Sequence, residues 1–462
     1  MKGAAEAAAM TVPVSPVMRT LAAFMAAAPQ HRLPAAVVEK TKHHVIDTLA
    51  AMISGTRLPP GRMAISYARA LGGVKQACIP GTRIVTSVVN AALANGMTGH
   101  ADETDDSHQP AFYHPGCAVV PAALAVAERE RSSGNALLRA VALGYDIGCR
   151  VNFALGAMKF HLAGHSTHSF GALFGAAAAA GALARFDARR MRWLLSYTAQ
   201  QASGVSCWMR DPGHIEKAFD FGGMPAKNAV SAALMVDSGM SGVEDVFSGE
   251  RNFLFAFGAA AGAGELTRGL GAAYEILGAN IKKWSVGSPI QAALDSMREL
   301  IRRHRLQPDA VKKVKIQVQD HEAAIVDNRD MPDICLQHLI AVMLLDGTVT
   351  FASSHDEARL KDRKVLGLRK KIEFAGSAEL TRAGGRQAVV EVWTRGGGHV
   401  MHHTRAVKGT SANPMTRAEV DEKCLDLMAP ILGKRKAQEL IDTVWGLEKV
   451  KDVRALRPLL QA

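Results

Sequence analysis

Aromatic side chains and long apolar runs are scarce in this sequence. Phe, Trp and Tyr together supply 5% of the 462 residues. No segment reaches about 18 apolar residues without a charged or polar interruption, so we expect no helix that crosses a membrane. The opening segment Met1–Pro13 lacks the unbroken apolar stretch of a secretory signal. These absences favour a protein of the cytoplasm.

Cysteine is also sparse, with six residues spread from Cys78 to Cys424. None forms a C-x-x-C pair, which argues against a zinc ribbon and against a disulfide scaffold. Unpaired thiols at such distances are typical of a reduced compartment. The cysteines therefore support the expectation of a cytoplasmic protein.

Acidic residues are outnumbered: 43 Asp and Glu stand against 55 Lys and Arg, and the formal net charge is +12. A nucleic-acid-binding protein usually gathers such an excess on one face or in one arm. Here the basic residues are spread along the chain and are not interleaved with aromatic ones. We therefore expect no nucleic-acid partner, and a basic surface can equally draw small anions towards a pocket.

Alanine, by contrast, is abundant, and hydrophobic residues make up 48% of the chain. Alanine loses no side-chain entropy in a helix and lets helices approach closely, so this composition favours packed helices over sheets. A chain of 462 residues is too long for one ordinary core. We expect a mainly α protein with two domains.

The first half of the chain has the pattern of successive helices. Apolar residues recur at three- and four-residue spacing, with glycines at the breaks. The segment 172–184 consists almost entirely of small residues, which indicates a helix buried between others. The expected helices are Val37–Ile53, Pro121–Arg131, Ala136–Val151, Gly171–Ala184 and Arg189–Ser203.

The pattern changes near residue 270. Val311–Gln319 alternates apolar and polar residues, which predicts a half-buried strand. Gln387–Thr394 and His399–Thr404 predict a hairpin joined by three glycines. Helical patterns lie between these strands at Leu336–Leu345 and after them at Arg417–Leu432.

We therefore expect a large all-helical domain formed by both ends of the chain, with a smaller α+β lid domain inserted into it. The expected bounds are 15–268 and 409–462 for the helical domain and 269–408 for the lid. A cleft between two such domains is the natural place for a ligand.

The densest polar segment is HADETDDSH, residues 100–108. Four carboxylates in five positions repel one another unless cations or solvent compensate their charge. The residues alone leave open a solvated surface loop, an Asp-rich magnesium site and a zinc site from His100, His108 and His114. The chain has no second acidic cluster to complete a magnesium site, and the histidine spacing matches no established zinc pattern.

A second segment, GHSTHSFG at residues 164–171, precedes the Ala-rich helix. Ser and Thr at this place are first of all a helix cap. The N–H groups of a helix N-terminus also attract carboxylates, so either His165 or His168 can serve as a catalytic residue here.

Two more segments supply cations. Residues 208–217 contain Arg210, His214 and Lys217, and IKKWSVGSP places Lys282 at the expected domain junction. Taken alone, the first also fits a solvated loop before a helix, and the second fits lysines that lie along the surface.

Taken in order and spacing, these segments resemble the MmgE/PrpD family, which includes 2-methylcitrate dehydratase, cis-aconitate decarboxylase and iminodisuccinate epimerase. The resemblance spans essentially the whole chain. It rests on HADETDDSH at 100–108, HPGCAVVPAALAVAE at 114–128, GHSTHSFGALFGAAAAA at 164–180 and EKAFDFGGMPAKNAV at 216–230, followed by IKKWSVGSP, MLLDGTVT and NPMTRAEV.

The resemblance implies a large helical domain, a smaller lid, a homodimer, and neither a metal nor an organic cofactor. The family's catalytic histidines fall on His114 and His165, and its lysines on Lys217 and Lys282. The acidic and hydroxyl positions of its motif fall on Glu103, Asp105, Asp106 and Ser107. Arg210, His214 and His338 complete the expected substrate contacts.

The sequence departs from the decarboxylase pattern in three places. Glu103 stands where the motif begins with Asp, His338 stands where a tyrosine is expected, and Gly287 stands where a histidine follows the junction lysine. These changes alter the hydrogen bonds available to a substrate and argue against cis-aconitate decarboxylation.

The resemblance implies a cofactor-independent lyase, of the dehydratase or decarboxylase type, and these residues suit a small di- or tricarboxylate as its substrate. Lysines hold the carboxylates, with His165 as general base and His114 as general acid. Glu103 or Asp106 orients a histidine or a lysine. Three alternatives stay open: an epimerase on the same site, a silent anion-binding relative, and a magnesium-dependent helical enzyme.

Overall fold

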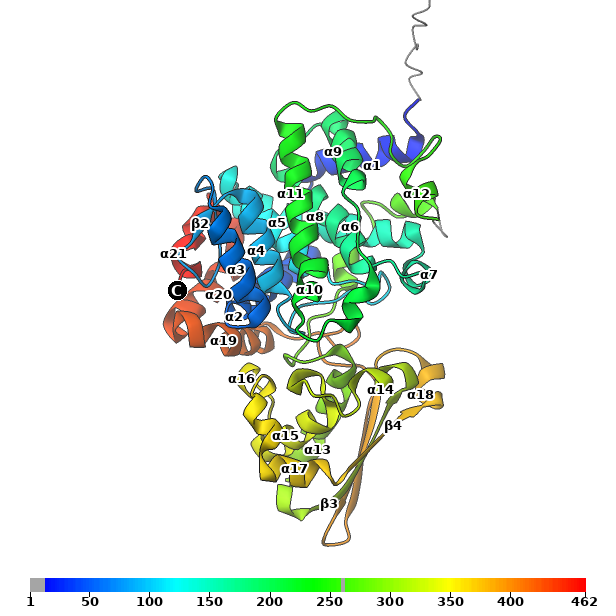
Figure 1. Cartoon of the computed structure of the whole chain (residues 1–462), viewed down its shortest axis with the longest axis vertical. Helices are drawn as coiled ribbons and strands as arrows, with labels where there is room; N and C mark the ends of the chain where they lie inside the picture. The colour runs from blue at the N-terminus through cyan, green and yellow to red at the C-terminus, as the bar shows by residue number, and fades with distance from the viewer. Residues whose placement is uncertain (1–12, 259–261) are drawn as a thin grey trace, which may run out of the picture.

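The chain folds into a large helical part and a smaller α+β part below it (Figure 1). The computed structural model describes residues 13–258 and 262–462, so most of the opening segment Met1–Pro13 lies outside it. One apolar core runs from Met18 to Ile281 and resumes from Met415 to Leu460. A separate core extends from Trp284 to Val407.

The helical part contains all five helices predicted from the first half of the sequence, and it also holds the C-terminal helices. A short hairpin of β1 (Ala77–Cys78) and β2 (Val85–Thr86) lies at its edge. Its helices are α1 (Pro16–Ala27), α2 (Ala35–Gly55), α3 (Pro59–Leu71), α4 (Val88–Gly99), α5 (Gly116–Arg129), α6 (Gly134–Leu155), α7 (Ala157–Leu162), α8 (Thr167–Leu183), α9 (Ala188–Gln200), α10 (Ile215–Ala218), α11 (Met224–Asp237), α12 (Phe253–Ala256), α19 (Arg417–Leu432), α20 (Lys434–Trp445) and α21 (Arg457–Leu460).

The Ala-rich helix α8 is the centre of this part, and every one of its residues is buried. It packs against α5, α6 and α11. At the contact with α6, a Cβ on Gly175 would lie only 2.4 Å from the carbonyl oxygen of Gly144, so only glycine permits this approach. The prediction of a small-residue helix buried between others is confirmed.

The two ends of the chain come together where α19 packs on α2. Thr416 caps α19 through a capping box with Glu419. In Figure 1 the C-terminal helices α19 and α20 lie beside α2 and α3.

The smaller part is a four-stranded sheet in the order β4-β3-β5-β6. The predicted strands and hairpin are confirmed, whereas β4, which pairs in parallel with β3, was not predicted. Figure 1 shows α13, α15 and α17 on one side of the sheet. The elements are α13 (Gln291–His304), β3 (Val311–Gln319), α14 (Asp320–Val326), α15 (Leu336–Asp346), α16 (Phe351–Ser354), α17 (Arg363–Arg369), β4 (Ile372–Ser377), α18 (Ala378–Ala383), β5 (Ala388–Thr394) and β6 (His399–Thr404).

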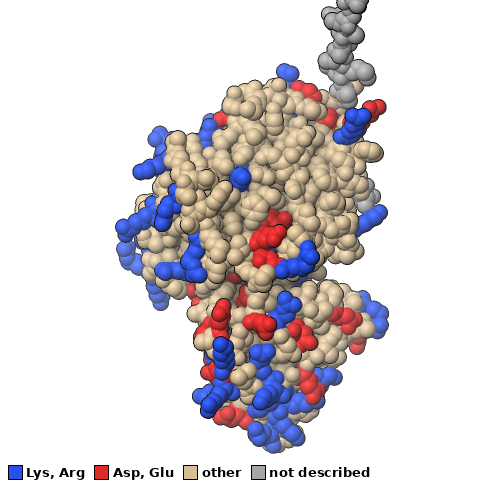
Figure 2. Space-filling model, in the orientation of Figure 1, with Lys and Arg blue, Asp and Glu red and all other residues tan. Residues whose placement is uncertain are grey.

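The surface carries both signs of charge. Figure 2 shows Lys and Arg spread over both parts of the molecule, with Asp and Glu interspersed among them on the smaller part. The six cysteines are free. Within residues 13–258 and 262–462, no helix combines the length and apolar character needed to span a membrane.

Candidate active site

The acidic turn, defined as residues 100–108, follows the end of α4 and is buried throughout. This burial excludes the solvated loop that its composition allowed. Backbone hydrogen bonds join Ser107 to Asn280 in both directions, at 3.0 and 2.7 Å. The turn therefore lies beside the segment that carries Lys282.

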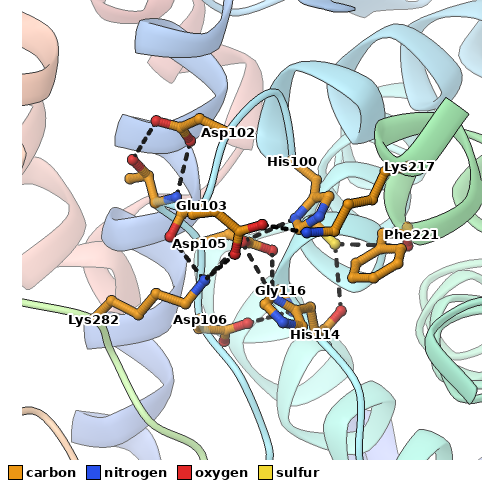
Figure 3. Close-up of polar contacts among 12 residues, drawn as sticks. His100, Asp102, Glu103, Asp105, Asp106, His114, Gly116, Lys217, Phe221 and Lys282 are labelled. Atoms are coloured by element: carbon orange, nitrogen blue, oxygen red, sulfur yellow. Dashed lines mark hydrogen bonds and ion pairs between the residues drawn. The ribbon is translucent and has the colours of Figure 1, made fainter. Parts of the chain in front are cut away.

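Glu103 is the centre of the charged cluster (Figure 3). Its carboxylate pairs with Lys217, and its other oxygen lies 3.5 Å from the Nζ of Lys282. Lys282 also donates a 2.7 Å hydrogen bond to the backbone carbonyl of Glu103. Burial opposes the charge on Glu103, but the two lysines hold its pKa well below the usual range.

Asp105 holds two imidazoles. The Nδ1 atoms of His100 and His114 lie 3.0 and 3.1 Å from its Oδ1. Burial lowers the pKa of His114 to about 4; Asp105 opposes this shift, and Lys282 adds to it. His114 is therefore neutral near pH 7, and the bond to Asp105 fixes its Nδ1 as the protonated nitrogen.

A phenylalanine positions two imidazoles of the cluster. The ring of Phe221 stacks on His168 at 3.8 Å between centroids and on His100 at 4.3 Å. Phe221 lies in a π-helical turn, Phe219–Gly223, a form that is rare and frequent at functional sites. Glycine makes this turn possible, because a Cβ on Gly222 would lie 2.1 Å from the carbonyl oxygen of Gly96 on α4.

His214 joins the cluster from a strained backbone. It has φ of +57°, in the left-handed region that non-glycine residues rarely adopt. Its ring centroid lies 5.0 Å from that of His100, and its Nδ1 lies 4.0 Å from Glu103. Burial lowers the pKa of His214 well below the usual value. Strain of this kind is concentrated at functional sites.

The structure places His168, and not His165, beside His114. The His114 and His168 rings lie 5.3 Å apart, and burial, aided by His114 and Lys217, lowers the pKa of His168 well below the usual value. His165 instead stacks on Phe160 at 4.2 Å and lies 5.9 Å from Phe257.

The backbone explains this difference. His165 precedes the helix and pairs with Val205 in a β-bridge, whereas His168 lies in the first turn of α8. We predicted the helix from Gly171, but it begins at Thr167, with Ser166 at the cap position. The Ser-Thr capping signal could have moved the predicted start and placed His168 on the helix.

Lys217 also lies against aromatic rings. Its Nζ is 5.2 Å from the centroid of Phe221 and 5.5 Å from that of Trp208. Cations are attracted to the faces of such rings. Together with Glu103, these contacts hold the ammonium group at one end of the imidazole cluster.

Asp106 and Ser107 have different positions from the acidic groups above. Asp106 accepts hydrogen bonds from His44, at 2.6 Å, from Tyr145 and from the backbone N–H of Gly116. Its carboxylate therefore holds the turn to the helices α2, α6 and α5. The Ser107 hydroxyl is buried and has no hydrogen-bond partner among the described residues. Its backbone holds the turn to the junction segment.

The two remaining predicted contacts lie outside the cluster. Arg210 is exposed at the end of a 3-10 turn, where solvent surrounds it. His338 is buried in α15, where burial, with help from Arg369 and Arg359, lowers its pKa to about 4. Their contacts with a substrate stay predictions.

Among the residues that the structure describes, three sets of side chains lie close enough to hold a metal ion: His100, Asp105 and Cys117; His100, Glu103 and His214; and His108, Cys149 and Glu275. In the first two, the carboxylates already bind lysines or imidazoles. In the third, the Nδ1 of His108 accepts the backbone N–H of Ala111. Burial also raises the pKa of the Cys149 thiol well above its usual value.

Sequence comparison covers most of both parts of the chain. The MmgE/PrpD N-terminal domain matches residues 19–269, and the MmgE/PrpD C-terminal domain matches residues 284–449. The chain belongs to the MmgE/PrpD family. This membership confirms the resemblance and the prediction that the chain is an enzyme.

Relatives of this MmgE/PrpD protein include cis-aconitate decarboxylases. The human enzyme is 24% identical over 92% of this chain and 90% of its own length. The enzyme of Aspergillus terreus is 23% identical over 93% and 92%. A cis-aconitate decarboxylase-like protein, oryM of Aspergillus oryzae, is 24% identical over 93% and 94%.

Proposed function

We propose that this MmgE/PrpD protein is a cofactor-independent lyase that acts on a small di- or tricarboxylate. The observation that carries the proposal is the convergence of Lys217, Lys282, His114 and His168 on one buried cluster. Three of these four residues were predicted from the sequence, and His168 takes the place of His165.

The lysines are the anion-holding groups in this proposal. Each already pairs with Glu103, which keeps it ordered before substrate arrives. A substrate carboxylate then joins or displaces the Glu103 carboxylate, and charge-assisted hydrogen bonds fix its orientation. The same ammonium groups stabilise the negative charge that develops when a C–H beside a carboxylate loses its proton.

The imidazoles are the proton carriers. Asp105 engages the Nδ1 of His114 and leaves Nε2 for the substrate. His168 provides the second imidazole. The negative charge of a bound substrate favours proton uptake by one ring. That imidazolium protonates the leaving hydroxyl or the neighbouring carbon, while the other, neutral ring removes the proton. Acid–base steps of this kind each contribute roughly 10²–10⁴-fold to the rate.

The substrate is proposed to differ from cis-aconitate, although the curated relatives decarboxylate that acid. Glu103 is one methylene longer than the Asp of the family motif, and its carboxylate occupies both lysines. His338 and Gly287 remove a tyrosine hydroxyl and an imidazole. The cluster therefore offers a different set of hydrogen bonds.

Epimerisation is the second candidate function. Two imidazoles with ring centroids 5.3 Å apart can remove a proton from a carbon and return it from another side. Lyase and epimerase share every residue named above, so the products must distinguish them.

A screen of di- and tricarboxylic acids by proton NMR in heavy water tests the proposal. Loss of water or carbon dioxide from an acid supports the lyase, and deuterium exchange without net loss supports the epimerase. If every acid is unchanged and none raises the melting temperature, the enzyme proposal fails; binding without turnover indicates a silent anion-binding relative.

We further propose that the protein works as a homodimer with no metal, as the resemblance implies, and that it is cytoplasmic with no nucleic-acid or membrane partner, as its composition indicates. Sedimentation of the purified protein tests the dimer. Activity that persists after chelation supports metal independence, whereas its loss would favour a metal-dependent enzyme.

A further inference from the structure

One ion pair crosses from the smaller part to the acidic turn. The Nε2 of His355, just after α16, lies 3.1 Å from the Oδ2 of Asp102. The Nδ1 of His355 lies 2.8 Å from the backbone carbonyl of Phe351 and donates its proton there. Both nitrogens of this imidazole therefore face acceptors, which favours the charged form.

Asp102 binds its own turn at the same time. Its Oδ1 accepts the backbone N–H of Thr104 at 2.9 Å, and its Oδ2 accepts the Thr104 hydroxyl at 2.6 Å. These two bonds close the backbone around Glu103, the residue that pairs with both lysines. The carboxylate that meets His355 is thus the one that shapes the turn.

The surroundings of His355 are acidic on both sides of the junction. Asp102 faces it from the turn, and Asp333 faces it from the smaller part. These two carboxylates outweigh the cost of burial and raise the pKa of His355 to about 9. Both Asp102 and Asp333 are buried, at 5% exposure each, so solvent screens the interaction little.

We propose that His355 is a positioning residue. Through its pairing with Asp102, the position of the smaller part against the helical part affects the conformation of the turn that carries Glu103 and Asp105. Nothing in this pair contacts the reacting groups directly. When His355 leaves Asp102, the turn loses an ion pair to the part of the chain that forms the Trp284–Val407 core. The catalytic consequence rests on the proposed function, but the coupling itself does not.

The first test needs no substrate. Amide hydrogen exchange is measured over residues 100–108 in the wild-type chain, in His355→Gln and in a matched control, His399→Gln. His399 belongs to the same part and also lies 3.1 Å from a carboxylate, that of Glu391, but far more exposed. We expect faster exchange in the turn for His355→Gln alone. Equal exchange in the two variants would overturn the proposal.

A second variant guards against simple unfolding. Asp102→Asn keeps the size of the side chain and should raise exchange in the same turn, while the strands of the smaller part exchange as in the wild type. If exchange rises everywhere, or nowhere, the coupling is wrong.

The third test uses the acid identified by NMR. His355→Gln should lower kcat by about tenfold with KM within about twofold, because misplaced acid–base groups slow chemistry more than binding. His355→Lys, which restores a cation, should recover most of that loss. Absence of recovery would contradict a positioning role. The exchange experiments do not depend on activity. A change in exchange without any turnover therefore contradicts the lyase proposal alone, and turnover without a change in exchange contradicts the coupling alone.

Discussion

The ammonium group of Lys282 donates a hydrogen bond to the backbone carbonyl of Glu103, 2.7 Å away and 179 residues earlier in the chain. Its Nζ also lies 3.5 Å from the Glu103 side chain and 3.7 Å from that of Asp105. One lysine at the junction therefore contacts both the backbone and the carboxylates of the acidic turn. Removing it should disturb substrate binding and the turn together.

Lys282→Ala is expected to raise KM at least about tenfold, because a charge-assisted contact to a substrate carboxylate is lost. Lys283→Ala is the matched control, since the Lys283 ammonium lies over Trp284 instead, 5.1 Å from the ring centroid. Steady-state kinetics with the acid found by NMR measures both variants. Equal KM values for the two would exclude Lys282 from the site.

His168→Gln is expected to reduce turnover at least about a hundredfold, because His168 lies beside His114 in the cluster. His165→Gln should reduce it far less, since the His165 ring packs on Phe160. Turnover is compared after circular dichroism shows that both variants are folded. If His165→Gln is the inactive variant, His165 and not His168 is the catalytic residue.

We expect the protein to take up a proton when it binds an anion. Glu103 and Asp105 balance the charges of Lys217 and Lys282, while burial keeps His114 neutral with a pKa of about 4. A bound dicarboxylate adds negative charge, which favours imidazolium and raises that pKa. Calorimetry with succinate near pH 7, in buffers of different ionisation enthalpy, measures the uptake. A binding enthalpy that is independent of the buffer would refute this.

The Glu103→Gln variant should bind succinate more tightly than the wild type does. It should also turn over the acid found by NMR more slowly. Neutralising Glu103 frees Lys217 and Lys282 to hold a foreign carboxylate, but removes the group that orders them. Glu322→Gln is the control, because Glu322 is also buried and pairs with Arg386 at 3.0 Å, away from the cluster. The succinate-induced rise in melting temperature should grow only in Glu103→Gln; a smaller rise would show that Glu103 helps to bind anions.

The His355 ion pair predicts a pH dependence of stability. Its pKa rises from 6.5 to about 9 on folding, so the stabilisation is complete below 6.5 and disappears as pH rises through 9. Thermal unfolding of wild type and His355→Gln from about pH 6 to about pH 10 measures this. The difference in melting temperature should shrink as pH rises. A constant difference would mean that His355 stabilises the fold without its charge.

Much of the architecture could be predicted because its signals are local. The three- and four-residue spacing of apolar side chains marked helices such as α2 and α6, and alternation marked β3 with its observed bounds. Strand β4 was missed because its short sequence, IEFAGS, gives little contrast between its faces and because it pairs with β3 across the 52 residues that separate the two strands. Pairing at that distance leaves no local pattern.

The sequence by itself determined the helical class, the strands of one hairpin and the set of groups available for catalysis: two lysines, an acidic turn and several histidines. Only the tertiary structure decided which histidine lies in the cluster beside His114. His165 and His168 are three residues apart and chemically identical, but the first turn of α8 and the packing of Phe221 direct their rings to different places. A side chain's direction depends on backbone geometry and on neighbours that are distant in the sequence, and the residue type determines neither.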